Sequence, residues 1–506
     1  MNQRLARQWP LGILFAILLL AAGVRLYCLG GPSLWKDERD SIMTAEGHFS
    51  DWEHLPTNRV IQPPDLYSPG NAGPWSNVWQ TFYFHPPLYP ILLRIWLDFV
   101  PETDSGVRGL SVLASLIAMI LLYDLGRMLV DAPAALWACA LFALSEPEII
   151  YAQEARAYAL WTALGLAAAA AAARLAVRGG NWRRAIALAA CALAMTLTQA
   201  LAVATIIALA IWCLAYLRGA ALRQAVIAGA VAAVLAIGLV LAGTLPGHAL
   251  HTADVIGWAH TTGGFQHDWG TIRFAALLPT LFLGSPPAGT GALAMVPGLV
   301  FVLCWILCIG PRGANRNGAM LFCAIWLWAG VLPVVFSDIF SSTSAILYVR
   351  FTLIAAPAFF LLISALPVGA NWRWLVPLAA VIGCAAAVPY EYDPLAKGDW
   401  RNLAGDVRKL AGPGDLIVFA NSPDAYLANP RQLYDAVNCY VHQIPCEVAI
   451  IDRPADAGLM ARFHAARHVW VVSSAARPDL QTFLPGWHLD SAAPKRILAA
   501  QVWKAE

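Results

Sequence analysis

Residues 156–217 decide the fold, and they read RAYALWTALGLAAAAAAARLAVRGGNWRRAIALAACALAMTLTQALAVATIIALAIWCLAYL. The stretch contains three apolar runs, near 156–177, 183–199 and 200–217. Each run is close to the roughly twenty residues that a helix needs to cross the hydrocarbon core of a bilayer. The basic loop RLAVRGGNWRR separates the first two runs. This pattern is typical of consecutive membrane spans joined by short loops.

The composition of the whole chain agrees with this interpretation. The 506 residues are 59% hydrophobic and only 13% charged, and their mean hydropathy is +0.60. Such a composition excludes an ordinary soluble protein of several domains, because most of the chain is suited to lipid. The net charge of +2 says little about nucleic-acid partners, since the charges lie in short loops.

Further apolar runs of span length lie on both sides of the opening stretch. They occur near 11–29, 107–129, 133–150, 224–243, 293–310, 318–336, 350–367 and 372–389. Together with the first three runs, they predict a polytopic helical membrane protein with about eleven spans. The run at the N-terminus is too long for a signal-peptide core and lacks a small-residue cleavage site, so we expect an uncleaved first span.

The arginines in short loops predict the orientation of these spans, because cytoplasmic loops are enriched in Lys and Arg. The basic loops contain Arg4 with Arg7, Arg127, residues 174–184, Arg218 with Arg223, Arg312 with Arg316, and Arg373. All of them face the cytoplasm if the N-terminus does, and the C-terminus is then periplasmic. The short run 85–100 would invert this order if it spanned, so we expect it to lie at the outer interface.

The predicted domain organisation follows from these spans. Residues 1–389 form a transmembrane domain, whose first outer loop, 30–106, contains interfacial helices. Residues 390–506 differ in character, because their apolar runs shorten to strand length between helical stretches. We therefore expect a small periplasmic α/β domain there. It contains Cys439 and Cys446, which could pair in an oxidising compartment.

Two adjacent acids, Asp37 and Glu38, follow the first span in the sequence SLWKDE. Held just above the bilayer, they are candidates for general base chemistry. The alternative is a solvated loop in which the acids neutralise Lys36 and Arg39.

A second group of charges interrupts apolar sequence in the turn YAQEARAY. Glu154 and Arg156 lie at the outer ends of two predicted helices. Charged groups at that depth are costly unless they are paired or face a wet cavity, so a cavity near Asp37 is one interpretation. An internal ion pair without a catalytic role is the other.

Two further sites are candidates for binding a phosphate at the outer face. His85 begins the sequence HPPLYP, and Arg350 follows Tyr348 at the start of a late span. A guanidinium suits phosphate well, although an arginine there could also extend to lipid headgroups. No Gly-rich nucleotide loop accompanies these cations, which favours a donor that is itself a lipid phosphate. The irregular spacing of His248, His251, His260 and His267 gives little indication of a metal.

The order of the motifs resembles that of bacterial GT-C glycosyltransferases, with family 39 and the aminoarabinose-transferase-like enzymes as the most similar groups. The motifs are SLWKDE, HPPLYP, VRGLSVL, EPEIIYAQEARAYAL, YVRFTLIAAP and DWRNLAGDVRKLAGPGDLIVF, which cover the chain from Arg25 to about Phe419. These groups include protein mannosyltransferases and lipid A sugar transferases, so the resemblance implies an enzyme of the bacterial inner membrane. It implies a hexosyl or pentosyl transferase that uses a polyprenyl-phosphate sugar, with inversion at the anomeric carbon.

The resemblance also assigns roles to residues. It implies that Asp37 is the base, with Glu38 beside it, and that Glu154 is the acid of the second outer turn. The cation before the double proline falls on His85, which would meet the carrier phosphate. The Arg-Tyr pair usual before the late helix is Arg350-Phe351 here, so Tyr348 is the candidate to replace the tyrosine. No cofactor is implied.

Several alternatives remain open at this stage. The chain could be a transporter or flippase for a lipid-linked sugar, although its acids gather at helix ends and no internal repeat is visible. A membrane scaffold, or a polymerase or ligase that uses an oligosaccharide on a diphosphate carrier, is also compatible. The sequence does not identify the sugar. The acceptor could be a glycolipid, a polysaccharide or a protein.

Overall fold

The computed structural model of the chain describes residues 3–67, 70–80, 86–244, 281–284, 314–341, 343–365, 374–392, 397–420, 429–474, 486–488 and 501–505, together with Phe274, Leu278 and Leu484. The chain divides into two compact units. The helical unit comprises Met1–Tyr27, Phe82–Tyr89 and Arg108–Tyr392. The mixed unit comprises Cys28–Thr81, Pro90–Val107 and Asp393–Glu506.

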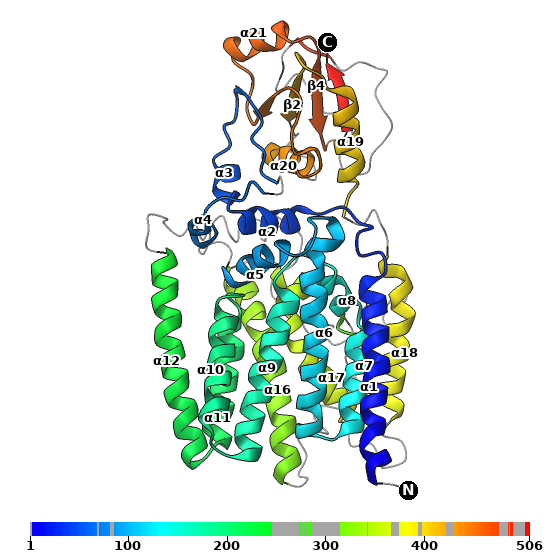
Figure 1. Cartoon of the computed structure of the whole chain (residues 1–506), viewed down its shortest axis with the longest axis vertical. Coiled ribbons are helices and arrows are strands. Elements are labelled where there is room, and N and C mark those ends of the chain that lie inside the picture. The colour runs from blue at the N-terminus through cyan, green and yellow to red at the C-terminus, as the bar shows by residue number, and fades with distance from the viewer. Residues whose placement is uncertain are drawn as a thin grey trace. The chain divides into compact units, whose positions relative to one another are not determined.

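Long helices dominate the helical unit (Figure 1). The helices of this unit, long and short, are α1 Gln3–Leu26, α6 Asp104–Leu129, α7 Ala132–Leu144, α8 Glu146–Ala152, α9 Tyr158–Arg178, α10 Trp182–Thr196, α11 Ala202–Tyr216, α12 Gly219–Thr244, α16 Ala314–Ser341, α17 Ala356–Ser364 and α18 Leu375–Ala387. Short 3-10 turns flank the late helices, namely η3 Ala345–Leu347, η4 Val349–Phe351, η5 Leu353–Ala355 and η6 Val388–Glu391. Helical segments therefore occur at every predicted span that falls within the described residues.

Five of the described helices are long and apolar enough to cross a membrane, or six if the bent pair α7 and α8 is one span. The other helices that coincide with predicted spans are shorter, so the count of eleven stays a prediction. The predicted span at 293–310 lies outside the described residues. The helix α5, Leu88–Leu97, has ten residues. At about 15 Å it is half the length of a span, and its interfacial position also stays a prediction.

Small residues let the helices of this unit approach closely. Helix α9 contains a run of seven alanines, and it packs against α10. At Gly165 of α9, a Cβ atom would come within 2.7 Å of Ile354 Cδ1. Packing of this kind stabilises helix association in lipid, where the hydrophobic effect between helices is weak.

A buried cation fixes the 61° bend between α7 and α8. Arg25 of α1 is fully buried, and its guanidinium donates to the carbonyl oxygens of Phe142 and Ala143, both at 2.9 Å. The same guanidinium donates to Ser115 Oγ at 2.9 Å. Pro147 follows the bend in the first turn of α8, where it interrupts the helical hydrogen bonds. Arg25 therefore satisfies carbonyl groups that the break exposes.

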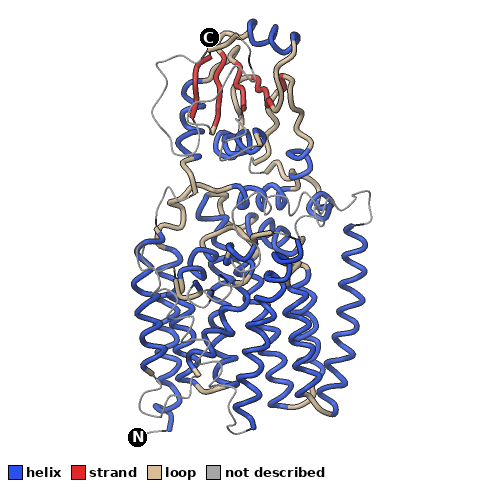
Figure 2. The backbone as a smooth tube through the Cα atoms, turned by 180° about the vertical axis from the view of Figure 1, so that it is seen from behind, coloured by secondary structure: helices blue, strands red, loops and turns tan. Residues whose placement is uncertain are grey.

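The mixed unit contains a sheet, whose strands are red in Figure 2. The sheet has five strands in the order β1-β3-β2-β4-β5. The strands are β1 Val60–Ile61, β2 Leu416–Ala420, β3 Glu447–Ile451, β4 Val469–Ser473 and β5 Gln501–Ala505. The central strand β2 is parallel to β3 and β4, whereas β1 and β5 are antiparallel edge strands. The helices from the C-terminal part are α19 Trp400–Leu410, α20 Pro430–Val441 and α21 Ala457–Ala465.

The mixed unit is larger than the predicted domain 390–506, because much of the loop 30–106 belongs to it. Strand β1 pairs with β3 through Val60 and Ala449. The loop also contains α2 Lys36–Glu46, α3 Phe49–Glu53 and α4 Trp75–Gln80. The division at residue 389 therefore separates strands that share one sheet. Cys439 and Cys446 are both buried and both free.

Candidate active site

Helix α2 presents the two predicted acids of the first loop in its first turn. The helix begins after Trp35, which is extended, and acids in a first turn are stabilised by the helix dipole. Glu38 is fully buried, and its Oε2 accepts a hydrogen bond from the Trp35 backbone N–H at 3.3 Å. The same oxygen lies 3.4 Å from Lys397 Nζ. Asp37 is only half-buried. The two acids therefore differ in environment.

A buried ion pair holds α2 in place. Arg39 Nε donates to Asp435 Oδ2 of α20 at 2.7 Å, and Arg39 Nη1 donates to the Leu34 carbonyl oxygen at 2.7 Å. Tyr67 donates its hydroxyl to the other oxygen of Asp435. Burial and the nearby carboxylate raise the pKa of Tyr67 well above its usual value, so the hydroxyl keeps its proton. These contacts fix the helix that carries Asp37.

Asp40 is an acid of α2 that the sequence argument did not select. It is 2% exposed, and its Oδ2 pairs with Lys36 Nζ at 2.5 Å. Burial raises the pKa of Asp40, and Asp37 adds to this effect while Lys36 opposes it. Among the described residues, Asp40 Oδ1 has no hydrogen-bond partner. The only sequence signal was the spacing of Lys36 and Asp40 at i and i+4.

In the helical unit, the turn between α8 and α9 contains the predicted Glu154 and Arg156. Glu154 is 4% exposed. The turn is fixed on one side by Gln153, whose Nε2 donates to the carbonyl oxygens of Arg25 and Tyr27 at 2.9 and 2.8 Å. On the other side, Ser111 of α6 donates to the Arg156 carbonyl oxygen at 3.2 Å. The charged side chains therefore project from a turn that α1 and α6 hold.

The structure brings the segment of Arg350 against this turn, because η4 contacts α8. Tyr151 of α8 interacts electrostatically with Glu154 and with Arg350, and it forms a hydrogen bond with the Arg350 backbone. Tyr151 therefore connects the second predicted site to the fourth. Spacing in the sequence does not reveal this role, although Tyr151 lies in the same motif as Glu154.

Aromatic rings surround the two arginines of this group. The Arg350 guanidinium carbon lies 5.1 Å from the ring centroids of Tyr348 and of Phe351. The Arg156 guanidinium carbon lies 5.8 Å from the ring of Tyr158. The rings of Tyr158 and Tyr151 are in turn 5.3 Å apart. We call these seven residues the tyrosine-arginine cluster: Tyr151, Glu154, Arg156, Tyr158, Tyr348, Arg350 and Phe351. Cations on aromatic faces keep their charge while losing water.

A buried acid shapes the loop before Tyr348. Asp338 of α16 is fully buried, and its Oδ1 accepts hydrogen bonds from Thr343 Oγ1 at 2.6 Å and from the Ala345 N–H at 2.8 Å. Its Oδ2 accepts from the Ile346 N–H at 2.8 Å. Asp338 therefore has a structural role that orients the approach to η3 and η4.

The predicted site residues fall into the two units as follows. Asp37 and Glu38 belong to the mixed unit, and Glu154, Arg156, Tyr348 and Arg350 belong to the helical unit. His85 lies outside the described residues, as do His248, His251, His260 and His267. Within the part of the chain that the structure describes, no group of three or more His, Cys, Asp or Glu residues could hold a metal ion.

Comparison with known proteins identifies the fold. No protein-family model and no curated protein sequence matches the chain. Among solved structures, ArnT from Cupriavidus metallidurans bound to undecaprenyl phosphate is 13% identical with a TM-score of 0.57, over 97% of this chain and 98% of that one. The oligosaccharyltransferase of Archaeoglobus fulgidus tethered with an acceptor peptide is 11% identical with a TM-score of 0.53, over 94% of this chain and 70% of that one.

The chain therefore has the fold of the GT-C glycosyltransferases, which confirms the resemblance predicted from its motifs. It is a polytopic helical membrane protein. The likeness extends over nearly the whole length of both units.

Proposed function

We propose that the protein is a glycosyltransferase that moves a sugar from a polyprenyl-phosphate carrier to an acceptor hydroxyl, with inversion at the anomeric carbon. The observation that supports this most is the fold shared with ArnT, a structure that contains undecaprenyl phosphate, over 97% of this chain. The sugar is a hexose or a pentose. The reaction takes place at the periplasmic face of a bacterial inner membrane.

Asp37 is the proposed general base. The acceptor hydroxyl must lose its proton as it attacks the anomeric carbon, and a carboxylate within hydrogen-bond reach can accept that proton, which is worth roughly 10²- to 10⁴-fold in rate. Asp37 is half-buried on a helix held by the Arg39 and Asp435 ion pair, so it is both accessible and positioned. Glu38 is buried against Lys397, which supports a positioning role for it.

The tyrosine-arginine cluster is the proposed site for the carrier phosphate. The C–O bond between sugar and phosphate breaks in the reaction, and the leaving phosphate gains negative charge. Arg156 and Arg350 can stabilise that charge, with the Tyr348 hydroxyl as a further donor. Glu154 is then the acid that orients one of these cations through Tyr151. The proposed contact of His85 with the phosphate rests on the sequence resemblance alone.

The acceptor is proposed to be a hydroxyl of a glycolipid, a polysaccharide or a protein. A membrane extract offers all three classes at once, so it can serve as the acceptor in a first assay. Separation of the labelled products by organic extraction and by protease treatment then assigns the class.

The proposal is tested by incubating the purified protein with radiolabelled polyprenyl-phosphate sugars and a membrane extract. We expect transfer by the wild type and at least a hundredfold loss in Asp37→Asn, given the usual contribution of a general base. Asp51→Asn is the matched control, because Asp51 lies in the same loop and its side chain is 59% exposed. It should keep wild-type activity.

Two results would contradict the proposal in different ways. Full activity in Asp37→Asn would remove Asp37 as the base while leaving the enzyme assignment intact. Movement of the labelled lipid between leaflets of a proteoliposome, without transfer to any acceptor, would instead favour a flippase.

A further inference from the structure

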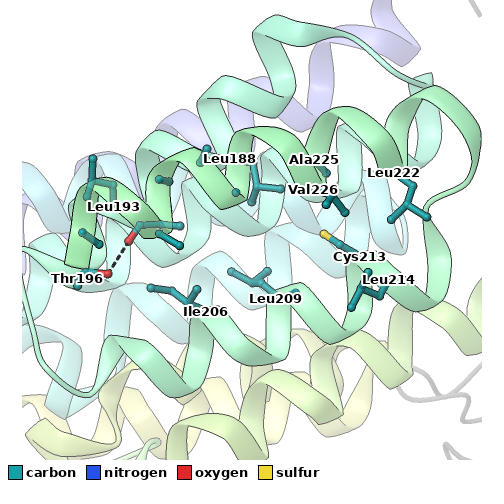
Figure 3. A pocket seen from close by; sticks show the side chains of 17 residues that line it. Leu188, Leu193, Thr196, Ile206, Leu209, Cys213, Leu214, Leu222, Ala225 and Val226 are labelled. Carbon is teal, nitrogen blue, oxygen red and sulfur yellow. Dashed lines mark hydrogen bonds between the residues drawn. The ribbon is translucent and has the colours of Figure 1, made fainter. Parts of the chain in front are cut away.

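An apolar groove lies on one side of the helical unit, between α10, α11 and α12 (Figure 3). It has a volume of about 400 Å³. Its walls are almost entirely aliphatic, with Leu188, Leu193, Ile206, Leu209 and Leu222 among the larger side chains. The one hydroxyl in the lining belongs to Thr196, and it donates to the Ala192 carbonyl oxygen of its own helix at 3.1 Å. Apart from Thr196 and the sulfur of Cys213, the groove therefore offers a ligand hydrocarbon contacts.

The length of the groove matches the depth of one bilayer leaflet. On α12 the lining extends from Leu222 to Ala236, which is about 21 Å at the helical rise. On α10 it extends from Leu188 to Thr196, which is about 12 Å. A leaflet contributes roughly half of the 30 Å hydrocarbon core. A single lipid chain lying parallel to the helices has the right chemistry and the right length.

Arginines gather at one end of this groove. Arg183 and Arg184 begin α10, Arg178 ends α9, and Arg218 and Arg223 flank the start of α12. All of these except Arg184, which is half-buried, are exposed. The two loops that carry them lie side by side, since a Cβ at Gly180 would come within 2.8 Å of the Ala221 nitrogen.

No acid balances these arginines within their own stretch of sequence. Residues 155–253 contain no Asp or Glu. Of the arginines near this end, Arg174 pairs with Asp124 of α6, but the ion pairs found among the described residues include none to Arg183, Arg218 or Arg223. The result is a positive patch that continues directly into an apolar groove.

We propose that this face of the helical unit binds an anionic phospholipid, with its phosphate on the arginine patch and one acyl chain in the groove. Basic pockets between membrane helices are known to hold anionic headgroups, and each arginine near an anionic surface strengthens binding by about fivefold. The groove supplies the second half of the site. The site requires both charge and hydrocarbon from its ligand.

This lipid site is separate from the tyrosine-arginine cluster. Helix α9 connects them, because Tyr158 of the cluster begins the helix and Arg178 of the patch ends it. Its 21 residues make about 30 Å, which is the thickness of the hydrocarbon core. The two sets of arginines therefore serve opposite ends of the membrane helices, and a carrier phosphate held at one end cannot occupy the other.

The test compares two leucine substitutions on the same helix. Gly229 lines the groove and Gly238 does not, and a Cβ at either position would meet nothing within 4 Å. The full-length protein is reconstituted in nanodiscs of equal phosphatidylglycerol and phosphatidylethanolamine, extracted into mild detergent, and its bound lipids are counted by native mass spectrometry. We expect wild type and Gly238→Leu to retain phosphatidylglycerol, and Gly229→Leu to lose it.

The headgroup contribution is tested with the arginines. Arg218→Gln with Arg223→Gln should weaken retention of phosphatidylglycerol on the order of thirtyfold, whereas the Lys pair at the same positions keeps most of it. If Gly229→Leu and Gly238→Leu retain equal amounts of phosphatidylglycerol, the groove does not bind the acyl chain. If the wild type retains phosphatidylglycerol and phosphatidylethanolamine equally, the arginine patch does not select an anionic headgroup. Recovery of polyprenyl phosphate in place of phospholipid would overturn the proposal as a whole.

Discussion

Glu102 is a residue of the mixed unit whose ionisation should affect stability. It lines a cavity of about 100 Å³ in the mixed unit, together with Asp104, Tyr440 and His442. Burial raises the pKa of Glu102 to about 8, with Glu46 and Asp65 adding repulsion. Its ordinary pKa is 4.5. The folded protein therefore keeps this proton over a range in which the unfolded chain loses it.

The expected consequence is a loss of stability as the pH rises. Below pH 4.5 both states hold the proton and Glu102 costs nothing, and between about 4.5 and 8 the native state bears a growing penalty. Above pH 8 the penalty is constant, at up to roughly 5 kcal/mol before a reduction for partial solvent access. Glu102→Gln should therefore melt higher than wild type at pH 9 and at a similar temperature at pH 4.5.

Thermal unfolding in detergent at both values of pH measures this effect. Glu53→Gln, at an exposed acid of the same unit, is the control and should follow wild type. If the melting temperatures of Glu102→Gln and wild type differ by the same amount at both values of pH, ionisation of Glu102 does not cause the loss of stability.

Among the elements, α2 and α20 should depend strongly on their shared ion pair. Arg39 and Asp435 are both almost fully buried. Asp435→Asn leaves the guanidinium without a counter-charge, which typically costs about 3–5 kcal/mol. Replacing both partners, as in Arg39→Met with Asp435→Leu, should recover most of that stability. Chemical denaturation of the three proteins tests this, and a double variant less stable than Asp435→Asn would contradict it.

The helices were predictable from sequence because hydropathy over twenty residues is a local property. The break at Ser145 inside the predicted span 133–150 was missed, although Pro147 was a visible signal. Strand β1 could not have been found, since two residues carry no period and their partner lies almost 400 positions away. Pairing over such distances depends on the folded sheet.

The candidate site was predictable only in part. Glu154 and Arg350 could be selected because each is a charge in an apolar context, and Asp37 because it is one of two adjacent acids after the first span. Tyr151 could not, since its role depends on contact between α8 and η4, which sequence spacing does not reveal. Asp338 was missed for the same reason, because its hydrogen bonds serve a loop that follows it.

For the whole molecule, the proposed topology predicts where each loop lies. It predicts a cytoplasmic N-terminus, a cytoplasmic loop at Gly179 and Gly180, and a periplasmic segment 390–506. Alkaline phosphatase fused after Glu506 should be active in cells, and the same enzyme inserted after Gly180 should be inactive. Activity at both positions, or only after Gly180, would contradict the predicted orientation.

The guanidinium of Arg25 has a consequence for biosynthesis. It caps the carbonyl groups of Phe142 and Ala143, which would otherwise be buried without a partner at a cost of about 1–3 kcal/mol each. Because α1 leaves the ribosome before α7, the Arg25 guanidinium is already in the membrane when α7 and α8 are inserted. A circular permutation that moved α1 behind α18 would reverse this order, and α7 would enter the bilayer with its last turn uncapped.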